Sequence, residues 1–243
     1  MRNNDQQQTK ENTDVTERTS SFQSMDRKNF LKWMGGAAVT TAFVAAGCDK
    51  HHSMTGSNAG GTAHLGSGDV GILNYAYALE QLEAAFYIKV MGNKFSGMTS
   101  EETQIFTDLM NHEKAHRDFL KAALSSNAIM DLEFDFSSID FSSRDSVLGT
   151  AQAFEDLGVS AYNGAGKLIS NSDYLLIAGK IVSVEARHAS AIRDLEMPQT
   201  TYFAGDDVIN ANGMDGALAP PKVLSTAGAY IKTEIDASQL PTG

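Results

Sequence analysis

The motif Glu-x-x-His occurs twice in the sequence, as Glu113 with His116 and as Glu185 with His188. Both copies lie in segments whose apolar residues recur at helical spacing. Because residues three apart project from one face of a helix, the carboxylate and the imidazole of each motif can reach the same metal ion. A single copy is a weak signal, since a solvated helix face or a core histidine explains it equally well. Two copies on separate helices favour a site for two metal ions.

Such a site needs two further carboxylates, because two divalent cations carry four positive charges and the two motifs supply only two negative ones. Glu80 and Glu155 each lie in another segment of helical spacing, and each is followed seven residues later by a tyrosine, Tyr87 or Tyr162. Seven residues make about two helical turns, so each tyrosine falls on the same stripe as its glutamate. Glu83 is an alternative to Glu80. We prefer Glu80 because its spacing to Tyr87 is repeated between Glu155 and Tyr162.

In its order of Glu, Glu-x-x-His, Glu and Glu-x-x-His, the sequence resembles the ferritin-like di-iron carboxylate proteins over residues 68–196, and its ligand order is similar to that of the bacterioferritin and rubrerythrin type. The resemblance implies two iron ions bound by four carboxylates and two imidazoles. Oxygen and nitrogen ligands without thiolates also suit manganese. The resemblance gives terminal positions to Glu80 and Glu155, bridging positions to Glu113 and Glu185, one ion each to His116 and His188, and a hydrogen bond to a ligand carboxylate to Tyr87 and Tyr162.

The helical segments predict an all-α fold, and the resemblance implies a ferritin-like four-helix bundle over residues 68–197 with one long crossover between helices 2 and 3. The stretch 127–144 breaks the helical period and is long enough for that crossover. We expect its phenylalanines to pack on the helices, and residues 198–243 to form an irregular tail that packs on the bundle. The expected helices span about 69–91, with Asp69 as N-cap, then 99–124, 145–169 and 173–197, and a short one at 221–231.

Residues 1–47 combine a polar extension, expected to be disordered, with the features of a lipoprotein-type signal peptide. Basic residues precede an apolar run of small residues that ends in Ala-Ala-Gly before Cys48, which resembles a bacterial lipobox. We therefore expect Cys48 to be acylated and to anchor an exported, periplasmic or cell-surface protein to the membrane. Residues 48–67 are expected to form a flexible linker. Export by Sec or by Tat, and a start at Met1 or at Met25, are both open.

The chain is acidic, with a formal net charge of −11 and a pI of about 4.9. Phosphate binding needs clustered lysine and arginine, which the sequence lacks, so we expect no nucleic-acid partner. The 243 residues suffice for one bundle core with a leader and a tail. A single cysteine excludes a disulfide within the chain. His51, His52 and His64 in the linker are more simply explained as solvated side chains than as metal ligands.

Three functions are consistent with the predicted centre. Two Fe(II) ions could reduce dioxygen or peroxide, and we favour this activity, as a ferroxidase or a peroxide scavenger. The same ligands could serve iron storage in a homo-oligomer. The chain also resembles the exported ferritin-like family that includes desiccation-related proteins, which implies a structural role in stress. His112 lies about 100° around the helix from Glu113, so we expect it at the surface or behind a ligand.

Overall fold

The computed structural model describes residues 61–242 of the chain. The predictions made for residues 1–60, namely the disordered extension, the signal peptide, acylation of Cys48 and most of the linker, lie outside the described residues. Residues 61–242 are mostly helical, and their two strands have two residues each. The predicted all-α fold class is therefore confirmed.

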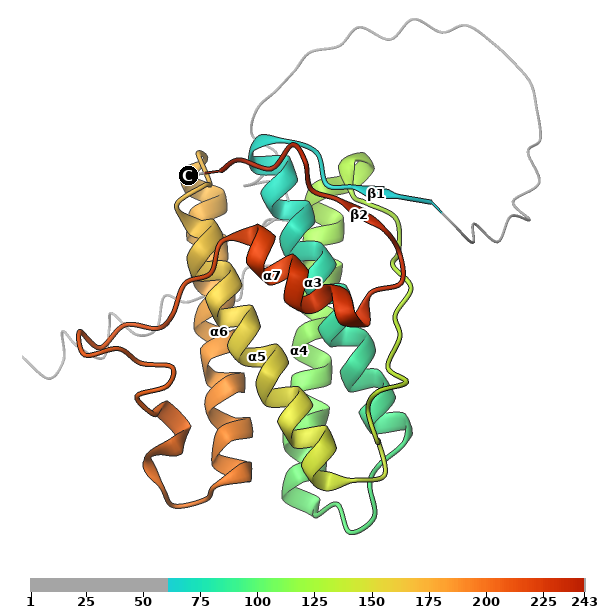
Figure 1. The fold of residues 1–243 in the computed structure, drawn as a ribbon, viewed down its shortest axis with the longest axis vertical. Coiled ribbons are helices and arrows are strands. Elements are labelled where there is room, and N and C mark those ends of the chain that lie inside the picture. Colours follow the sequence, from blue (N-terminus) through green and yellow to red (C-terminus); the bar gives the residue numbers. More distant parts are fainter. Residues whose placement is uncertain (1–60, 243) are drawn as a thin grey trace, which may run out of the picture. The chain divides into compact units, whose positions relative to one another are not determined.

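Four long helices form the bundle and carry all six predicted ligands (Figure 1). α3 packs mainly along α4, and α5 mainly along α6, whereas contacts between these two pairs are sparse. Each pair is therefore a helical hairpin, and the bundle consists of two hairpins laid against each other. The helices are α3 (Gly68–Gly92), α4 (Ser100–Leu124), α5 (Arg144–Gly166) and α6 (Ser172–Glu196).

Residues 128–143 join the two hairpins and run along the bundle from the end of α4 to the start of α5 (Figure 1). Because this crossover returns the chain to the end where α4 began, α4 and α5 point in the same direction. Phe136 packs edge-on against Phe86 of α3, with ring centroids 6.2 Å apart. The backbone N–H of Leu132 donates to the side-chain carbonyl of Gln81, at 2.8 Å. The expected crossover and its packing through phenylalanine are thus both present.

Side chains cap the start of α4 and join it to the start of α5. The Thr99 hydroxyl accepts a hydrogen bond from the N–H of Glu102 at 3.1 Å, and the Glu102 carboxylate accepts one from the N–H of Thr99 at 2.8 Å. This capping box satisfies two N–H groups that have no partner inside the helix. Glu102 also pairs with Arg144, the first residue of α5, at 2.6 Å.

Asp69 does not cap the first helix as expected. The N-cap of α3 is Ser67, and Asp69 lies inside the first turn. Its carboxylate instead accepts hydrogen bonds from the backbone N–H groups of Ser170 and Asn171, at 2.7 and 2.8 Å. Asp69 therefore connects the start of α3 to the turn that precedes α6.

α3 is buried around most of its circumference, including at several polar positions. The side-chain carbonyls of Asn74 and Gln81 accept hydrogen bonds from backbone N–H groups of the crossover, that of Asn74 from Ile129 at 3.0 Å. The Asn74 amide nitrogen donates to the carbonyls of Leu65 and Asn127. Glu80 and Glu83 are also buried, at 0% and 4% exposed. An ionised carboxylate in such a position costs several kcal/mol unless a partner offsets the loss of water. Both carboxylates therefore need a compensating charge or a proton.

The C-terminal tail packs on the bundle through short elements. α7 contacts α5, and the short helix expected at 221–231 is observed as α7 followed by one 3-10 turn. β2 pairs in parallel with β1, which places the end of the expected linker beside the tail. The short elements are β1 (Ala63–His64), η1 (Ser125–Asn127), η2 (Thr201–Ala204), α7 (Pro220–Ala227), η3 (Gly228–Tyr230) and β2 (Ile235–Asp236).

Arg193 of α6 holds the first part of the tail in place. Its side chain is only 2% exposed and pairs with Asp156 of α5 at 2.8 Å and with Asp207 of the tail at 2.7 Å. The guanidinium also lies 4.6 Å from the ring centroid of Tyr202. Two carboxylates and an aromatic face together compensate the burial of this cation.

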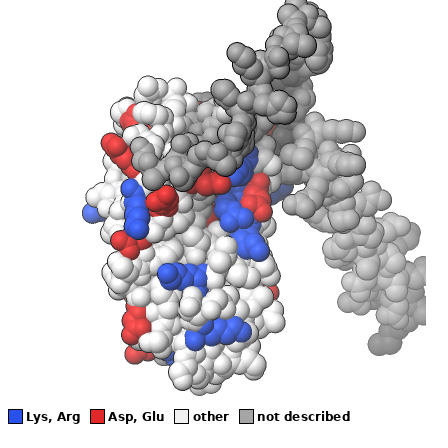
Figure 2. All heavy atoms as spheres, turned by 90° about the vertical axis from the view of Figure 1, so that its right-hand side faces the viewer, with Lys and Arg blue, Asp and Glu red and all other residues white. Residues whose placement is uncertain are grey.

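The described surface carries both signs of charge. On the face shown in Figure 2, basic and acidic side chains alternate over the part of the molecule that is described. None of the helices within residues 61–242 combines the length and the apolar character that crossing a bilayer requires.

Gly164 of α5 lies where the tail crosses this helix, and we predict that Gly164→Ala displaces the tail. A Cβ at this position would lie 1.9 Å from the carbonyl oxygen of Leu218, whose own N–H donates to the carbonyl of Ser160 at 2.9 Å. Because backbone cannot yield as a flexible side chain does, we expect a loss of about 1–3 kcal/mol in the free energy of unfolding. Chemical denaturation measures this loss, and hydrogen exchange should rise in the tail.

Gly149→Ala in the same helix is the matched control. The nearest atom to a Cβ there is a carboxylate oxygen of Glu196 at 3.9 Å, an ordinary contact. Alanine at an unhindered helical position stabilises a protein by about 0.5–1 kcal/mol relative to glycine. Equal effects of the two substitutions would contradict the close approach of the tail at Gly164.

Candidate metal centre

The structure brings the six predicted ligand residues together inside the bundle. They form two groups, in each of which one potential ligand atom from every member lies within 4.8 Å of the others. Glu113 and Glu185 belong to both groups. All four glutamates are fully buried. The first group is Glu80, Glu113, His116 and Glu185, and the second is Glu113, Glu155, Glu185 and His188.

Each of the two shared glutamates presents one oxygen to each group. Oε2 of Glu113 lies 3.5 Å from Nδ1 of His116, while its Oε1 lies 2.8 Å from Nδ1 of His188. Oε1 of Glu185 lies 2.9 Å from Nδ1 of His116, while its Oε2 lies 3.6 Å from Nδ1 of His188. A carboxylate placed in this way can bridge two ions.

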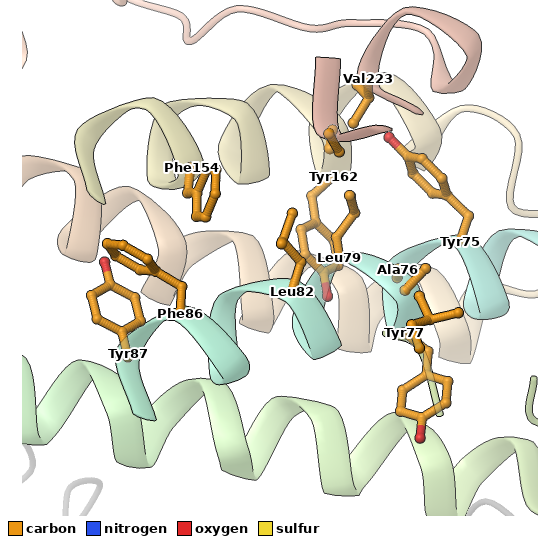
Figure 3. Close-up of a cluster of buried hydrophobic side chains, with 14 of the residues drawn as sticks. Tyr75, Ala76, Tyr77, Leu79, Leu82, Phe86, Tyr87, Phe154, Tyr162 and Val223 are labelled. Carbon is orange, nitrogen blue, oxygen red and sulfur yellow. The ribbon is translucent and has the colours of Figure 1, made fainter. Parts of the chain in front are cut away.

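The other two glutamates are held by tyrosines of the opposite hairpin. Tyr162 of α5 donates to Oε1 of Glu80 on α3, and Tyr87 of α3 donates to Oε1 of Glu155 on α5, both at 2.5 Å. In Figure 3 each of these rings reaches from its own helix towards the other. Oε2 of each glutamate then faces one imidazole, at 3.5 Å. The sequence spacing placed each tyrosine beside the glutamate of its own helix, but the hydrogen bond is formed between helices.

The ligand atoms are aimed at shared positions rather than at one another. The contacts between imidazole nitrogen and carboxylate oxygen are short, yet none has the direction of a hydrogen bond, so these buried atoms have no hydrogen-bond partner. Buried polar atoms in proteins almost always have one. Oxygen and imidazole nitrogen atoms that converge in this way fit divalent first-row metals. The atoms are Oε2 of Glu80 and Glu155, both oxygens of Glu113 and Glu185, and Nδ1 of His116 and His188.

The electrostatics of the carboxylates show a site that lacks positive charge. Burial, followed by the charge of Glu185, raises the pKa of Glu80 well above its usual value. Burial also raises the pKa of Glu155 to about 8, although His188 opposes the shift. For Glu113, burial acts in the same direction but the two imidazoles outweigh it and lower the pKa to about 2. A carboxylate in this interior therefore stays ionised only where a cation stands beside it.

When no metal ion is bound, the imidazoles provide that positive charge by taking up protons. Burial by itself would lower the pKa of His116, but Glu113, Glu185 and Glu80 together raise it to about 12. Burial likewise opposes protonation of His188, and Glu155 and Glu113 outweigh it and raise the pKa of that imidazole. Since a metal binds neutral imidazole, a metal ion and these protons compete for the same positions.

Glu83 is a fifth buried carboxylate that lies outside both groups. It is 4% exposed and forms no hydrogen bond or ion pair with any described residue. Burial, followed by the charges of Glu185 and Glu113, raises its pKa well above the usual value. Gly158 leaves room for it, because a Cβ there would lie 3.0 Å from Oε1 of Glu83. The spacing Glu80-x-x-Glu83 signalled a second carboxylate on the same helical face, but not that it would remain unpaired.

His112 contacts the centre from outside. Its Nδ1 lies 2.9 Å from Nε2 of His188, and the two rings are within 9° of parallel. His112 itself is exposed. The sequence predicted a place at the surface or behind a ligand, and His112 lies at the surface while contacting the predicted ligand His188. Its partner could not be found by periodicity, because that partner belongs to another helix.

We predict that Glu83→Gln stabilises the metal-free protein at neutral pH. The folded pKa of Glu83 is raised, so above about pH 4.5 the unfolded chain loses a proton that the folded chain keeps, and stability falls as pH rises. Glutamine removes this penalty, which is about 1.4 kcal/mol for each unit by which the pKa is raised. Denaturant unfolding of both proteins between pH 4 and 8, after removal of metal with a chelator, measures the difference in the free energy of unfolding.

Glu133→Gln, in the crossover, controls for the loss of a negative charge at an exposed position. We expect it to leave the pH dependence unchanged. A lower stability of Glu83→Gln at neutral pH would show instead that the Glu83 carboxylate is ionised and attracted by the protonated imidazoles.

A comparison with family models supports the fold. A model described as a ferritin-like domain matches residues 68–198, which is more than half of the chain and includes all six residues of the two groups. No curated protein matches the chain in sequence. The chain belongs to the ferritin-like domain family.

Proposed function

We propose that this protein binds two iron ions between its helices and uses them to reduce dioxygen or peroxide. The observation that carries the proposal is the pair of ligand groups that share Glu113 and Glu185, with buried atoms that lack any other partner. Four carboxylates balance the charge of two divalent ions. Carboxylate and imidazole ligands without thiolates favour iron or manganese over a structural zinc site.

Two Fe(II) ions would together supply two electrons, which with two protons convert dioxygen to hydrogen peroxide, or peroxide to two molecules of water. Glu113 and Glu185 would fix the distance between the ions, because each offers one oxygen to either position. Tyr87 and Tyr162 hold Glu155 and Glu80 so that only one oxygen of each faces a metal position. Of the two imidazoles, His116 is the more exposed, at 14% against 4% for His188, so we propose that small molecules reach the centre on its side.

The sequence before the described residues supports a location outside the cytoplasm. Basic residues followed by a small, apolar run and Cys48 indicate an exported lipoprotein. We propose that the bundle is attached to a membrane surface through an acyl group on Cys48. An anchored protein would meet iron, oxygen and peroxide in the periplasm or at the cell surface.

Iron titration tests the metal site directly. Fe(II) added to the metal-free full-length chain in air should bind to about two ions per chain and be oxidised, with near-ultraviolet absorbance of the ferric product. Glu113→Ala removes an oxygen from both positions, so we expect loss of stoichiometric binding and of rapid oxidation. Metal analysis after desalting, stopped-flow absorbance and circular dichroism measure binding, oxidation and folding.

Glu133→Ala is the matched control, because that glutamate is exposed and belongs to neither group. Because protons occupy the imidazoles of the metal-free site, binding should also release protons and strengthen as pH rises. Stoichiometric binding without oxidation would leave iron storage as the function. Zinc bound in place of iron, or no metal at all, would contradict the redox function and favour a structural role.

We further predict that Cys48→Ser moves the protein from the membrane fraction to the soluble fraction. Serine keeps the size of the side chain but has no thiol to accept an acyl group. Fractionation and metabolic labelling with a radioactive fatty acid measure the change. Label on the serine variant, or an unchanged distribution, would contradict the proposed anchor.

A further inference from the structure

The two imidazoles of the centre differ in what their outer nitrogens contact. His188 turns Nδ1 towards the carboxylates, and its Nε2 lies 2.9 Å from Nδ1 of His112. His116 also turns Nδ1 inwards, but its Nε2 forms no hydrogen bond with any described residue. The His116 side chain is 14% exposed, against 4% for His188. One imidazole is therefore held on both sides and the other on one side only.

The inner ligands themselves are nearly symmetric, so a difference between the two positions must come from the residues around them. Glu113 and Glu185 are shared. Glu80 and Glu155 each accept one tyrosine hydrogen bond of the same length. The asymmetry arises beside the motifs: the residue before Glu113 is His112, whereas the residue before Glu185 is Val184, whose side chain cannot accept a hydrogen bond.

The chemistry of imidazole fixes the direction of the His188 hydrogen bond once Nδ1 binds a metal. The neutral ring then carries its proton on Nε2 and donates it to Nδ1 of His112, which in turn carries its own proton on the exposed Nε2. Such a partner holds the ring in its binding orientation and makes the ligating nitrogen more basic. Loss of a partner of this kind typically weakens metal affinity by about 10–100-fold.

We propose that His112 is a positioning residue that makes the two metal positions unequal. The position formed by Glu113, Glu155, Glu185 and His188 binds a divalent cation more tightly and fills first. The position that contains Glu80 and His116 binds more weakly and exchanges its ion with solvent. The inference rests on the proposed metal binding and adds an order of filling to it.

Anaerobic titration of the metal-free full-length chain with Co(II), followed by calorimetry and visible absorbance, tests this order. We expect two steps whose affinities differ by about 10–100-fold. Glu155→Ala should remove the tighter step and Glu80→Ala the weaker one, because each glutamate belongs to one group only. Cobalt is the probe because its visible spectrum reports coordination in each step without any turnover.

The His112 variants separate positioning from folding. His112→Leu keeps a side chain of similar width without an acceptor, and should weaken the tighter step by about 10–100-fold while leaving the weaker step unchanged. His112→Asn should restore most of the difference, because its Oδ1 stands where Nδ1 of the histidine stood. Asn111→Leu, a neighbouring exposed position with no hydrogen bond to any described residue, should change neither step.

The outcomes distinguish this inference from the function on which it rests. Two equal steps in the unmodified chain, or an equal weakening of both steps in His112→Leu, would overturn the inequality while leaving metal binding intact. A weaker step that remains in Glu80→Ala would overturn the assignment of positions. Failure of the folded, unmodified chain to bind cobalt or iron at all would overturn the proposed function together with the inference.

Discussion

The constraint on which the structure depends is the burial of four carboxylates within a few ångströms of one another. An apolar interior offers no water to solvate them, so their charge must be balanced by protons, by the two imidazoles or by metal ions. The response is uneven: the pKa of Glu80 and that of Glu155 are raised, whereas Glu113, which faces both imidazoles, keeps a low pKa. Two divalent cations would satisfy all four carboxylates at once. A fold that tolerates this interior is thus best explained by the ions it can hold.

The same centre also connects the two halves of the bundle. Helices pack extensively within each hairpin and only sparsely between hairpins. Between the hairpins, Tyr87 bonds to Glu155 and Tyr162 bonds to Glu80. Metal ions bridged by Glu113 of one hairpin and a glutamate of the other would add to this connection. Any metal ion bound at the centre would therefore stabilise the bundle, because anything that binds only the folded state stabilises it.

Motif spacing predicted which residues would lie together at one site, but not their partners on other helices. A spacing of three places Glu113 and His116 on one helical face whatever surrounds them, and the structure brings them to one site. A spacing of seven located Tyr87 correctly, yet its hydrogen bond goes to a helix 68 residues away. The contact between Gly164 and the tail could not be predicted either, because the sequence does not show which glycines lie where two segments approach closely. Local pattern determines which face a residue occupies, whereas the neighbour across that face depends on how distant elements pack.

A repeated motif need not produce two equivalent sites. The spacing of Glu and His is the same in α4 and α6, and the resulting inner ligands are nearly symmetric. The flanking residues are not repeated: Glu83 on α3 corresponds to Gly158 on α5, three residues after the respective glutamate, and the carboxylate of the first occupies space left by the second. His112, which precedes Glu113, likewise has no counterpart in α6, where Val184 precedes Glu185. The predicted ligands are the residues that the two halves share, so any difference between two bound ions would have to come from the residues in which the halves differ.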